Sequence, residues 1–211
     1  MKNRSNINIL LNGFNIVIAS YLMLFFTSIF FVIISQNMYF LNEIRNKYIV
    51  LYTQIALPMT ISLIILPLIF EIFVYKNDRK SLGFILLNSS NKYNFCIYLI
   101  TLFIYIAIIF SNINDFRNVL LLSVYVFIQC FGEEILFRSV IQRRLQLVMN
   151  SKWAIIFGTL IFVFLFHEDT MLNNLLFRTP IAIVLSYTFY KTKSIYPTTL
   201  IHFVYNLYYS I

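Results

Sequence analysis

The sequence predicts an all-α fold, a polytopic transmembrane helical bundle of about seven spans with its N-terminus inside. Hydrophobic residues make up 60% of the 211 residues and charged residues only 11%, whereas a soluble domain carries about 25% charged residues. Several apolar runs approach or exceed the roughly 18–20 residues that cross a bilayer. The net charge of +8 comes from Lys and Arg in short segments between these runs, which is typical of membrane topology and does not indicate nucleic-acid binding.

The spans are predicted at residues 14–35, 49–75, 93–111, 118–141, 153–167, 173–190 and 195–210. The first is too long for the core of a signal peptide, so we expect it to be retained. The second contains Pro58 and Pro67, which favour a kink or a break, and a break would give an eighth span. The fourth is expected to continue as a helix beyond the membrane. No linker or repeat divides the chain, so residues 1–211 are predicted to form one domain.

The distribution of Lys and Arg predicts the orientation. With the N-terminus inside, the inner segments carry eleven of these residues and the outer segments carry four. Cytoplasmic loops are the ones enriched in Lys and Arg. The count therefore predicts an inner N-terminus and an outer C-terminus, and it leaves Arg138 inside the fourth span.

The fourth span contains the stretch QCFGEEILFR, with Glu133, Glu134 and Arg138 in an apolar setting. A charge at the bilayer centre costs roughly 2.5–3.5 kcal/mol on insertion scales. Glu134 and Arg138 are one helical turn apart and can pair, whereas Glu133 is about 100° further round the helix. Glu133 is then available as a general base. The alternative is a structural ion pair that joins two helices. Gly132 leaves room for a substrate or for another helix.

Both histidines of the chain lie in or at the end of apolar spans. His167 ends the fifth span, where it either caps the helix or joins a site, and the acids after it either orient its ring or are solvated. His202 and Asn206 share one face of the last span, as interhelical hydrogen-bonding groups or as site residues. Together with Glu133 they form a set suited to hydrolysis of an amide by activated water, with Asn206 donating to the oxyanion.

The expected depths of these residues set a geometric condition. At about 1.5 Å per residue, Glu133 lies roughly 12 Å and His202 roughly 10 Å from the inner ends of their spans. His167 is expected near the outer end of the fifth span, so that helix must be tilted for the three side chains to meet. We predict that Glu133, His167 and His202 line one cavity.

The motifs resemble those of the CAAX protease and bacteriocin-processing (CPBP or Abi) family, which includes the type II CAAX prenyl endopeptidases. Its pattern is Glu-Glu-x-x-x-Arg, then Phe-x-x-x-His, then His-x-x-x-Asn. Glu133 to Arg138 match the first motif and His202 to Asn206 the last. The middle motif departs, because Val163 stands four residues before His167 and phenylalanines stand at 162, 164 and 166. Ser139 follows the arginine where many members have glycine. The resemblance covers about residues 118–211.

The resemblance implies an intramembrane glutamic endopeptidase. Glu133 is then the base that activates water, and Glu134 and Arg138 are the supporting pair. His167, His202 and Asn206 would orient the water and stabilise the transition state. A zinc ion at Glu133, His167 and His202 is an alternative, but the His-Glu-x-x-His motif of zinc proteases is absent, so no cofactor is expected.

The expected partners are the lipid bilayer and a peptide or membrane-associated protein substrate. In a prokaryotic plasma membrane, processing of a peptide precursor or bacteriocin immunity would fit. One alternative is a catalytically silent member of the family that acts as a membrane scaffold or immunity protein and binds a partner. Another is a small transporter with Glu133 and the histidines as a proton relay. An inverted repeat would favour the transporter, and the sequence contains no evident one.

Overall fold

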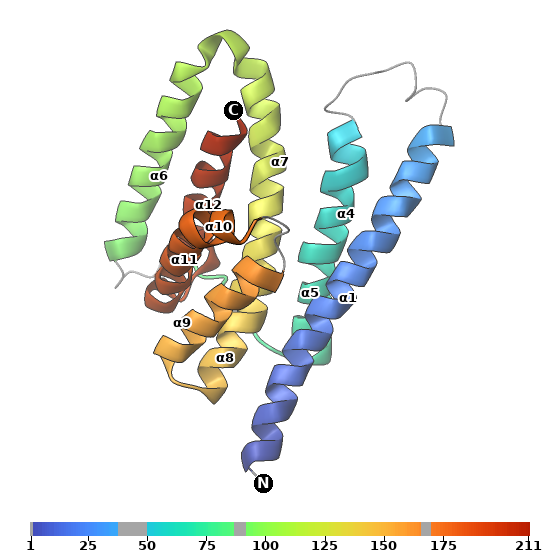
Figure 1. Cartoon of the computed structure of the whole chain (residues 1–211), viewed down its shortest axis with the longest axis vertical. Coiled ribbons are helices and arrows are strands. Elements are labelled where there is room, and N and C mark those ends of the chain that lie inside the picture. The colour runs from blue at the N-terminus through green and yellow to red at the C-terminus, as the bar shows by residue number, and fades with distance from the viewer. Residues whose placement is uncertain (1, 38–49, 87–91, 166–169) are drawn as a thin grey trace.

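The computed structural model describes residues 2–37, 50–86, 92–165 and 170–211, and all regular elements within these ranges are helical (Figure 1). Several helices join end to end into longer rods. The chain begins with α1 (Lys2–Asn37), the rod Tyr52–Val74, which contains α4 (Leu57–Met59) and α5 (Leu66–Ile69), and α6 (Lys92–Ser111). The rod Ile113–Val148 follows and contains α7 (Phe116–Glu134), a wider π-type segment (Ile135–Gln142) and α8 (Arg143–Val148). The last helices are α9 (Ser151–Leu160), extended by Ile161–Leu165; α10 (Met171–Asn173), continued by Asn174–Arg178 into α11 (Thr179–Thr192); and α12 (Ile195–Ser210).

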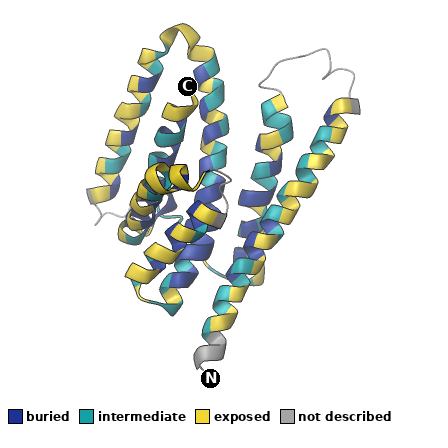
Figure 2. Cartoon of the chain, in the orientation of Figure 1, coloured by how far each residue is buried: buried dark blue, intermediate teal, exposed yellow. Residues whose placement is uncertain are grey.

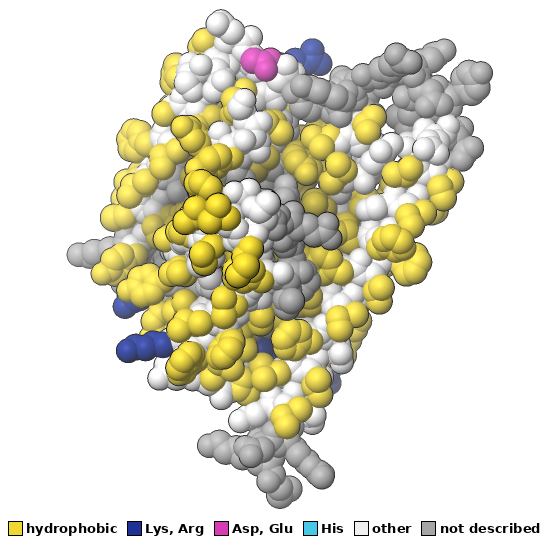
Figure 3. All heavy atoms as spheres, in the orientation of Figure 1, with side chains coloured by type: hydrophobic (Ala, Val, Ile, Leu, Met, Phe, Trp, Pro, Cys, Tyr) yellow, Lys and Arg dark blue, Asp and Glu magenta, His cyan; other side chains and the backbone are white. Residues whose placement is uncertain are grey.

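The protein is an all-α membrane protein. Among the described residues, four helices are long and apolar enough to cross a bilayer: Asn6–Gln36, Tyr52–Val74, Tyr93–Ser111 and Ile113–Val148. Apolar side chains are spread over the face shown in Figure 3, where an acidic and a basic group lie at the top and a few basic groups lie in the lower half. Each of the seven predicted spans overlaps a helix, whereas the number of crossings and the inner N-terminus stay predictions.

The break predicted at the prolines of the second span is absent. The rod Tyr52–Val74 continues through Pro58 and Pro67 as one helix. A proline inside a helix lacks the N–H for the usual hydrogen bond and clashes with the preceding turn. Wider π-type turns precede both prolines, at Tyr52–Ala56 and Thr60–Ile65, and such local adjustments let membrane helices accommodate proline.

The helices form two groups in Figure 1. The first group is α1 beside the rod Tyr52–Val74, and the second contains α6, α7 and α12, with α9 to α11 packed against them. The rod Ile113–Val148, which contains α7, is the part of the second group that lies next to the first group. Its lower half is the most buried part of the chain (Figure 2). The predicted helical continuation of the fourth span is confirmed, since this rod extends to Val148.

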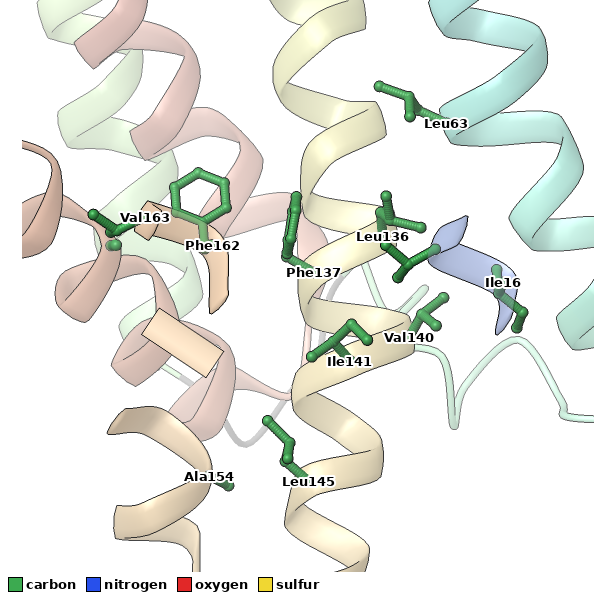
Figure 4. Close-up of a cluster of buried hydrophobic side chains, with 12 residues drawn as sticks. Ile16, Leu63, Leu136, Phe137, Val140, Ile141, Leu145, Ala154, Phe162 and Val163 are labelled. Atoms are coloured by element: carbon green, nitrogen blue, oxygen red, sulfur yellow. The ribbon is translucent and has the colours of Figure 1, made fainter. Parts of the chain in front are cut away.

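A hydrophobic core around the π-type segment joins the two groups (Figure 4). Leu136 and Val140 face α1 and the second rod, and Phe137 packs edge-to-face on Phe162 with the ring centroids 4.9 Å apart. The fully buried members are Ile16, Val17, Leu63, Leu136, Phe137, Val140, Ile141, Leu145, Ala154, Phe162, Val163 and Ala182. Since this core surrounds Ile135–Gln142, it holds rigidly the segment that follows the two glutamates.

Gly132 lets the second rod approach α7 closely. A Cβ atom at this position would stand 2.9 Å from the Cβ of Leu63, a distance that real Cβ atoms do not reach. Of the two uses predicted for the small residue, the structure therefore shows the packing of another helix. This contact brings the N-terminal group against the turn that carries the glutamates.

A buried ionic group lies near the C-terminal end of the rod Ile113–Val148 and was not predicted from the sequence. We call it the Glu71 cluster (Glu71, Asn77, Arg143 and Arg144). Arg143 Nη2 lies 3.0 Å from Glu71 Oε2, and Arg144 Nη1 pairs with Glu71 Oε1. Asn77 Nδ2 donates to Glu71 Oε2 at 2.6 Å. Glu71 is an isolated acid in the second apolar run, so the cost of burying a charge could have drawn attention to it.

Candidate active site

The two adjacent glutamates lie at the C-terminal end of α7, where it packs against α12. Backbone hydrogen bonding widens to the π type directly after them, at Ile135–Gln142, and π turns occur frequently at functional sites. His202 and Asn206 come from α12. The tight packing of α7 on α12 therefore brings together motifs that are far apart in the sequence.

Glu134 has both of its carboxylate oxygens engaged. Its Oε2 accepts from Arg138 Nε at 3.0 Å, which is the predicted i,i+4 pair, and both side chains are fully buried. Its Oε1 lies 2.9 Å from His202 Nδ1. Since an ionised carboxylate can only accept, His202 Nδ1 carries the proton and Nε2 points away from Glu134. The contact to His202 was not predicted, because its partners are 68 residues apart.

Glu133 meets the other side of the same imidazole. Its Oε2 lies 3.8 Å from His202 Nε2, which is longer than a direct hydrogen bond. Its Oε1 accepts from Gln129 Nε2, one turn earlier on α7, at 3.1 Å. The predicted meeting of Glu133 and His202 is confirmed, with the histidine between the two carboxylates. Gln129 was not predicted, although its i,i+4 spacing to Glu133 could have indicated it.

Polar groups from two further helices hold Arg138. Its Nη1 donates to Ser186 Oγ of α11 at 2.8 Å and lies 3.4 Å from Gln142 Oε1. Ser186 Oγ is in turn 3.2 Å from Thr159 Oγ1 of α9. Sequence reasoning did not single out these hydroxyls. Small hydroxyl residues in apolar spans are typical interhelical contacts, so they carry little signal in isolation.

The aromatic ring of the site comes from Phe162, one residue before the position at which the middle motif of the family has phenylalanine. The centre of its ring is 5.1 Å from the Arg138 guanidinium carbon and 5.8 Å from the His202 ring centre. Val163 is fully buried in the hydrophobic core. The ring that covers the buried cation and the histidine therefore comes from the residue before the position that the family pattern marks. His167 lies outside the described residues, as do Glu168 and Asp169.

A cavity of about 420 Å³ opens beside His202. Its lining combines amides, an arginine, tyrosines and apolar side chains: Gln129, Phe162, Asn173, Phe177, Arg178, Ile181, His202, Tyr205, Asn206 and Tyr209. Glu133 is not among the described residues that line the cavity, but it contacts Gln129 and approaches His202, which both line it. A cavity of this size with a few convergent polar groups is the usual form of a small binding site.

Asn206 lies at the inner wall of this cavity. Its Nδ2 is 3.4 Å from the Sγ of the buried Cys130, a weak acceptor. The structure thus brings Asn206, His202, Gln129 and Glu133 to one region, as the sequence predicted for three of them. The chemical roles of these residues stay predictions.

The metal alternative involves a residue that the structure does not describe. Among the described residues, no three His, Cys, Asp or Glu side chains are grouped so that they could hold a metal ion. The zinc set predicted from the sequence includes His167, so its geometry is not available for a test.

The candidate site thus consists of two buried glutamates, an arginine and a histidine beside a cavity among apolar helices. Residues 115–208 match the model of the family described as type II CAAX prenyl endopeptidase Rce1-like. The match places this part of the chain in that family of membrane endopeptidases, and it confirms the family predicted from the motifs. No curated protein and no solved structure matches the chain significantly.

The family match of residues 115–208 and the apolar helices together indicate a multi-pass membrane protein. A member of this family in a membrane meets lipid and a membrane-associated protein substrate. The match begins at the start of α7 and ends within α12, so it contains both glutamates, Arg138, His202 and the described cavity lining except Tyr209.

Proposed function

We propose that the protein is an intramembrane endopeptidase that hydrolyses a peptide bond near the membrane with water activated by Glu133. One observation carries the proposal: Glu133 Oε2 and His202 Nε2 face each other at 3.8 Å. His202 belongs to the lining of the cavity of about 420 Å³. A carboxylate and an imidazole acceptor so placed can both accept from one water molecule, which raises the electron density on its oxygen.

The chemical step follows from these positions. Glu133 takes a proton from the water while the water oxygen forms a bond to the carbonyl carbon of the substrate. Negative charge develops on the carbonyl oxygen, and the Asn206 amide at the cavity wall can donate to it. When the C–N bond breaks, the proton on Glu133 passes to the leaving amine. The products are a carboxylic acid and an amine, and Glu133 returns to its starting state.

The two glutamates have different proposed roles in the reaction. Glu134 is bound by Arg138 and by His202, so it keeps the imidazole in one tautomer and orientation. Such an acid–histidine contact is a common way to orient a catalytic ring. Glu133 has a neutral amide on one oxygen and faces the histidine with the other. This arrangement supports Glu133 as the base and Glu134 as a positioning residue.

We propose that the reaction needs no metal ion, on the ground that the sequence lacks the zinc-protease motif. His202 is also suited to metal binding, because a carboxylate on one ring nitrogen often supports a histidine ligand. Treatment of the active protein with 1,10-phenanthroline separates the two mechanisms. We expect the cleavage rate to be unchanged within about twofold. A loss of activity that added Zn²⁺ restores would contradict the metal-free mechanism.

The substrate class is proposed as a peptide precursor, or a peptide acting in bacteriocin immunity, at the plasma membrane of a prokaryote. The accompanying topology is seven crossings with the N-terminus inside, as the distribution of Lys and Arg predicts. Reporter fusions at the two ends of the chain would measure this orientation, and both ends on the same side would contradict it.

The decisive test is Glu133→Gln, which keeps the size of the side chain and removes the base. Comparative peptidomics of membranes containing either protein identifies the cleaved peptide, and the purified proteins are then assayed on it. We expect the rate to fall about 10²- to 10⁴-fold, the usual contribution of general base catalysis, with an unchanged unfolding temperature. A phenotype that survives in Glu133→Gln would instead indicate a scaffold or immunity protein that binds a partner without cutting it.

A further inference from the structure

Gln129 has no counterpart in the family motifs, yet its side chain contacts the proposed base. We propose that Gln129 is a positioning residue, whose side-chain amide holds one oxygen of Glu133 so that the other faces His202. This inference rests on the proposed function, because it assigns a role within the same site.

The geometry for this role is local and complete. Gln129 stands one helical turn before Glu133 on α7, the spacing at which two side chains meet on a helix surface. Its Nε2 donates to Glu133 Oε1 at 3.1 Å. The terminal torsion of a glutamate is broad and rotates easily. A hydrogen bond to Oε1 restricts this torsion and keeps Oε2 at 3.8 Å from His202 Nε2.

The donor at Glu133 Oε1 is a neutral amide, whereas the donors at Glu134 include a guanidinium. Glu134 is held by the Arg138 guanidinium and by the protonated nitrogen of His202. Hydrogen bonds from charged donors are roughly twice as strong as those between neutral groups, so such a donor would compete with the proton that a base must accept. An amide orients the carboxylate and adds no charge. The chain thus gives adjacent carboxylates two different kinds of partner.

Gln129 also lies at the boundary between the base and the cavity. It is half-buried and belongs to the cavity lining, whereas Glu133 is buried. Two roles are consistent with that location, namely orientation of Glu133 or direct contact with the substrate. They differ in kinetics, because a change that affects only catalysis lowers kcat, whereas loss of a uniform substrate contact raises KM.

The kinetic experiment uses Gln129→Met in the full-length protein in lipid nanodiscs. Methionine has a similar length and no donor. The probe is an internally quenched, prenylated CAAX peptide, the kind of substrate named in the family description. We expect kcat to fall about tenfold to a hundredfold, the range for loss of a hydrogen bond to a charged group, with KM unchanged within twofold. A normal kcat, or a raised KM alone, would overturn the positioning role.

Two further variants separate positioning from general packing. Gln54 is a half-buried glutamine on another helix that donates to Ser35 Oγ at 2.7 Å, so Gln54→Met is a matched control, expected to keep the wild-type kcat. Gln129→Lys retains a donor but makes it charged. We expect it to be at least as slow as Gln129→Met, because the ammonium forms an ion pair with Glu133. Wild-type kcat in Gln129→Lys would show that a neutral donor is not required.

An infrared measurement tests the contact independently of activity. In protein labelled with ¹³C-glutamate, the carboxylate band that disappears in Glu133→Gln belongs to Glu133. We expect this band to shift in Gln129→Met and to stay in place in Gln54→Met. An unshifted band in Gln129→Met would overturn the inference even in an active enzyme. Failure of the proposed function itself would be seen in the comparative peptidomics, as the absence of any cleavage that depends on Glu133, and the positioning role would then fall with it.

Discussion

Two buried clusters of charged side chains lie along the rod Ile113–Val148, and each has an excess of charge of the opposite sign. The active-site cluster (Glu133, Glu134, Arg138 and His202) has two carboxylates for one guanidinium. The Glu71 cluster has two guanidinium groups for one carboxylate. Each cluster places an arginine over an aromatic ring, Arg138 over Phe162 at 5.1 Å and Arg144 over Tyr75 at 5.3 Å.

The difference between the clusters shows what makes a buried acid available for chemistry. Both oxygens of Glu71 are bound by arginines, and Asn77 adds a third donor. Glu133 is bound by a neutral amide and faces a histidine beside a cavity. Burial of charge alone therefore does not identify an active site. The kind of donor at each oxygen and the presence of a cavity separate a structural carboxylate from a candidate base.

The largest effect on the comparison is expected from Arg138→Met. This change leaves Glu134 buried without its guanidinium and removes the bond to Ser186. Removal of one partner from a buried ion pair typically costs about 3–5 kcal/mol, and the misplaced His202 should abolish cleavage. Denaturant unfolding in micelles measures the loss. The double variant Glu134→Gln/Arg138→Met is the control and should regain most of the stability without activity. A loss below about 1 kcal/mol would contradict a stabilising role for the pair.

Glu71→Gln is expected to act on stability alone. It leaves Arg144 buried and Arg143 partly buried, without a counter-ion among their described contacts. We expect a loss of about 2–4 kcal/mol, at or below the range for a fully buried pair because Arg143 reaches solvent. The value of kcat should stay within about twofold of wild type. A fall in kcat like that of Arg138→Met would show that the two clusters act as one unit.

The smallest effects are expected from the two aromatic rings. Phe162→Leu and Tyr75→Leu each remove a ring from an arginine, and a cation–π contact contributes about 0.5–2 kcal/mol. Only Phe162 also contacts His202, with the ring centres 5.8 Å apart. We therefore expect a lower kcat in Phe162→Leu alone, and the larger loss of stability in the same variant because Phe162 is also buried in the hydrophobic core. Equal kcat values in the two variants would show that the Phe162 ring does not help to position His202.

Much of the architecture could be predicted because its signals are local. Long apolar runs identified the helices, and the i,i+4 spacing identified the Glu134–Arg138 pair. Of the kink or break favoured at Pro58 and Pro67, the break does not occur, since π-type turns accommodate both prolines within a continuous rod. The contacts of His202 with Glu134 and of Glu71 with Arg143 and Arg144 could not be predicted, since their partners stand 68, 72 and 73 residues apart.

The sequence by itself predicted the class of the protein, the family and the candidate site residues. These depend on composition, on spacing within single helices and on residue type. Only the tertiary structure decided how the charges are shared. The packing of α7 on α12 put the imidazole of His202 between two carboxylates and gave Glu134 a second partner beside Arg138. The physical reason is that contacts between helices depend on distances of a few ångströms, which helix packing sets and spacing along the chain does not.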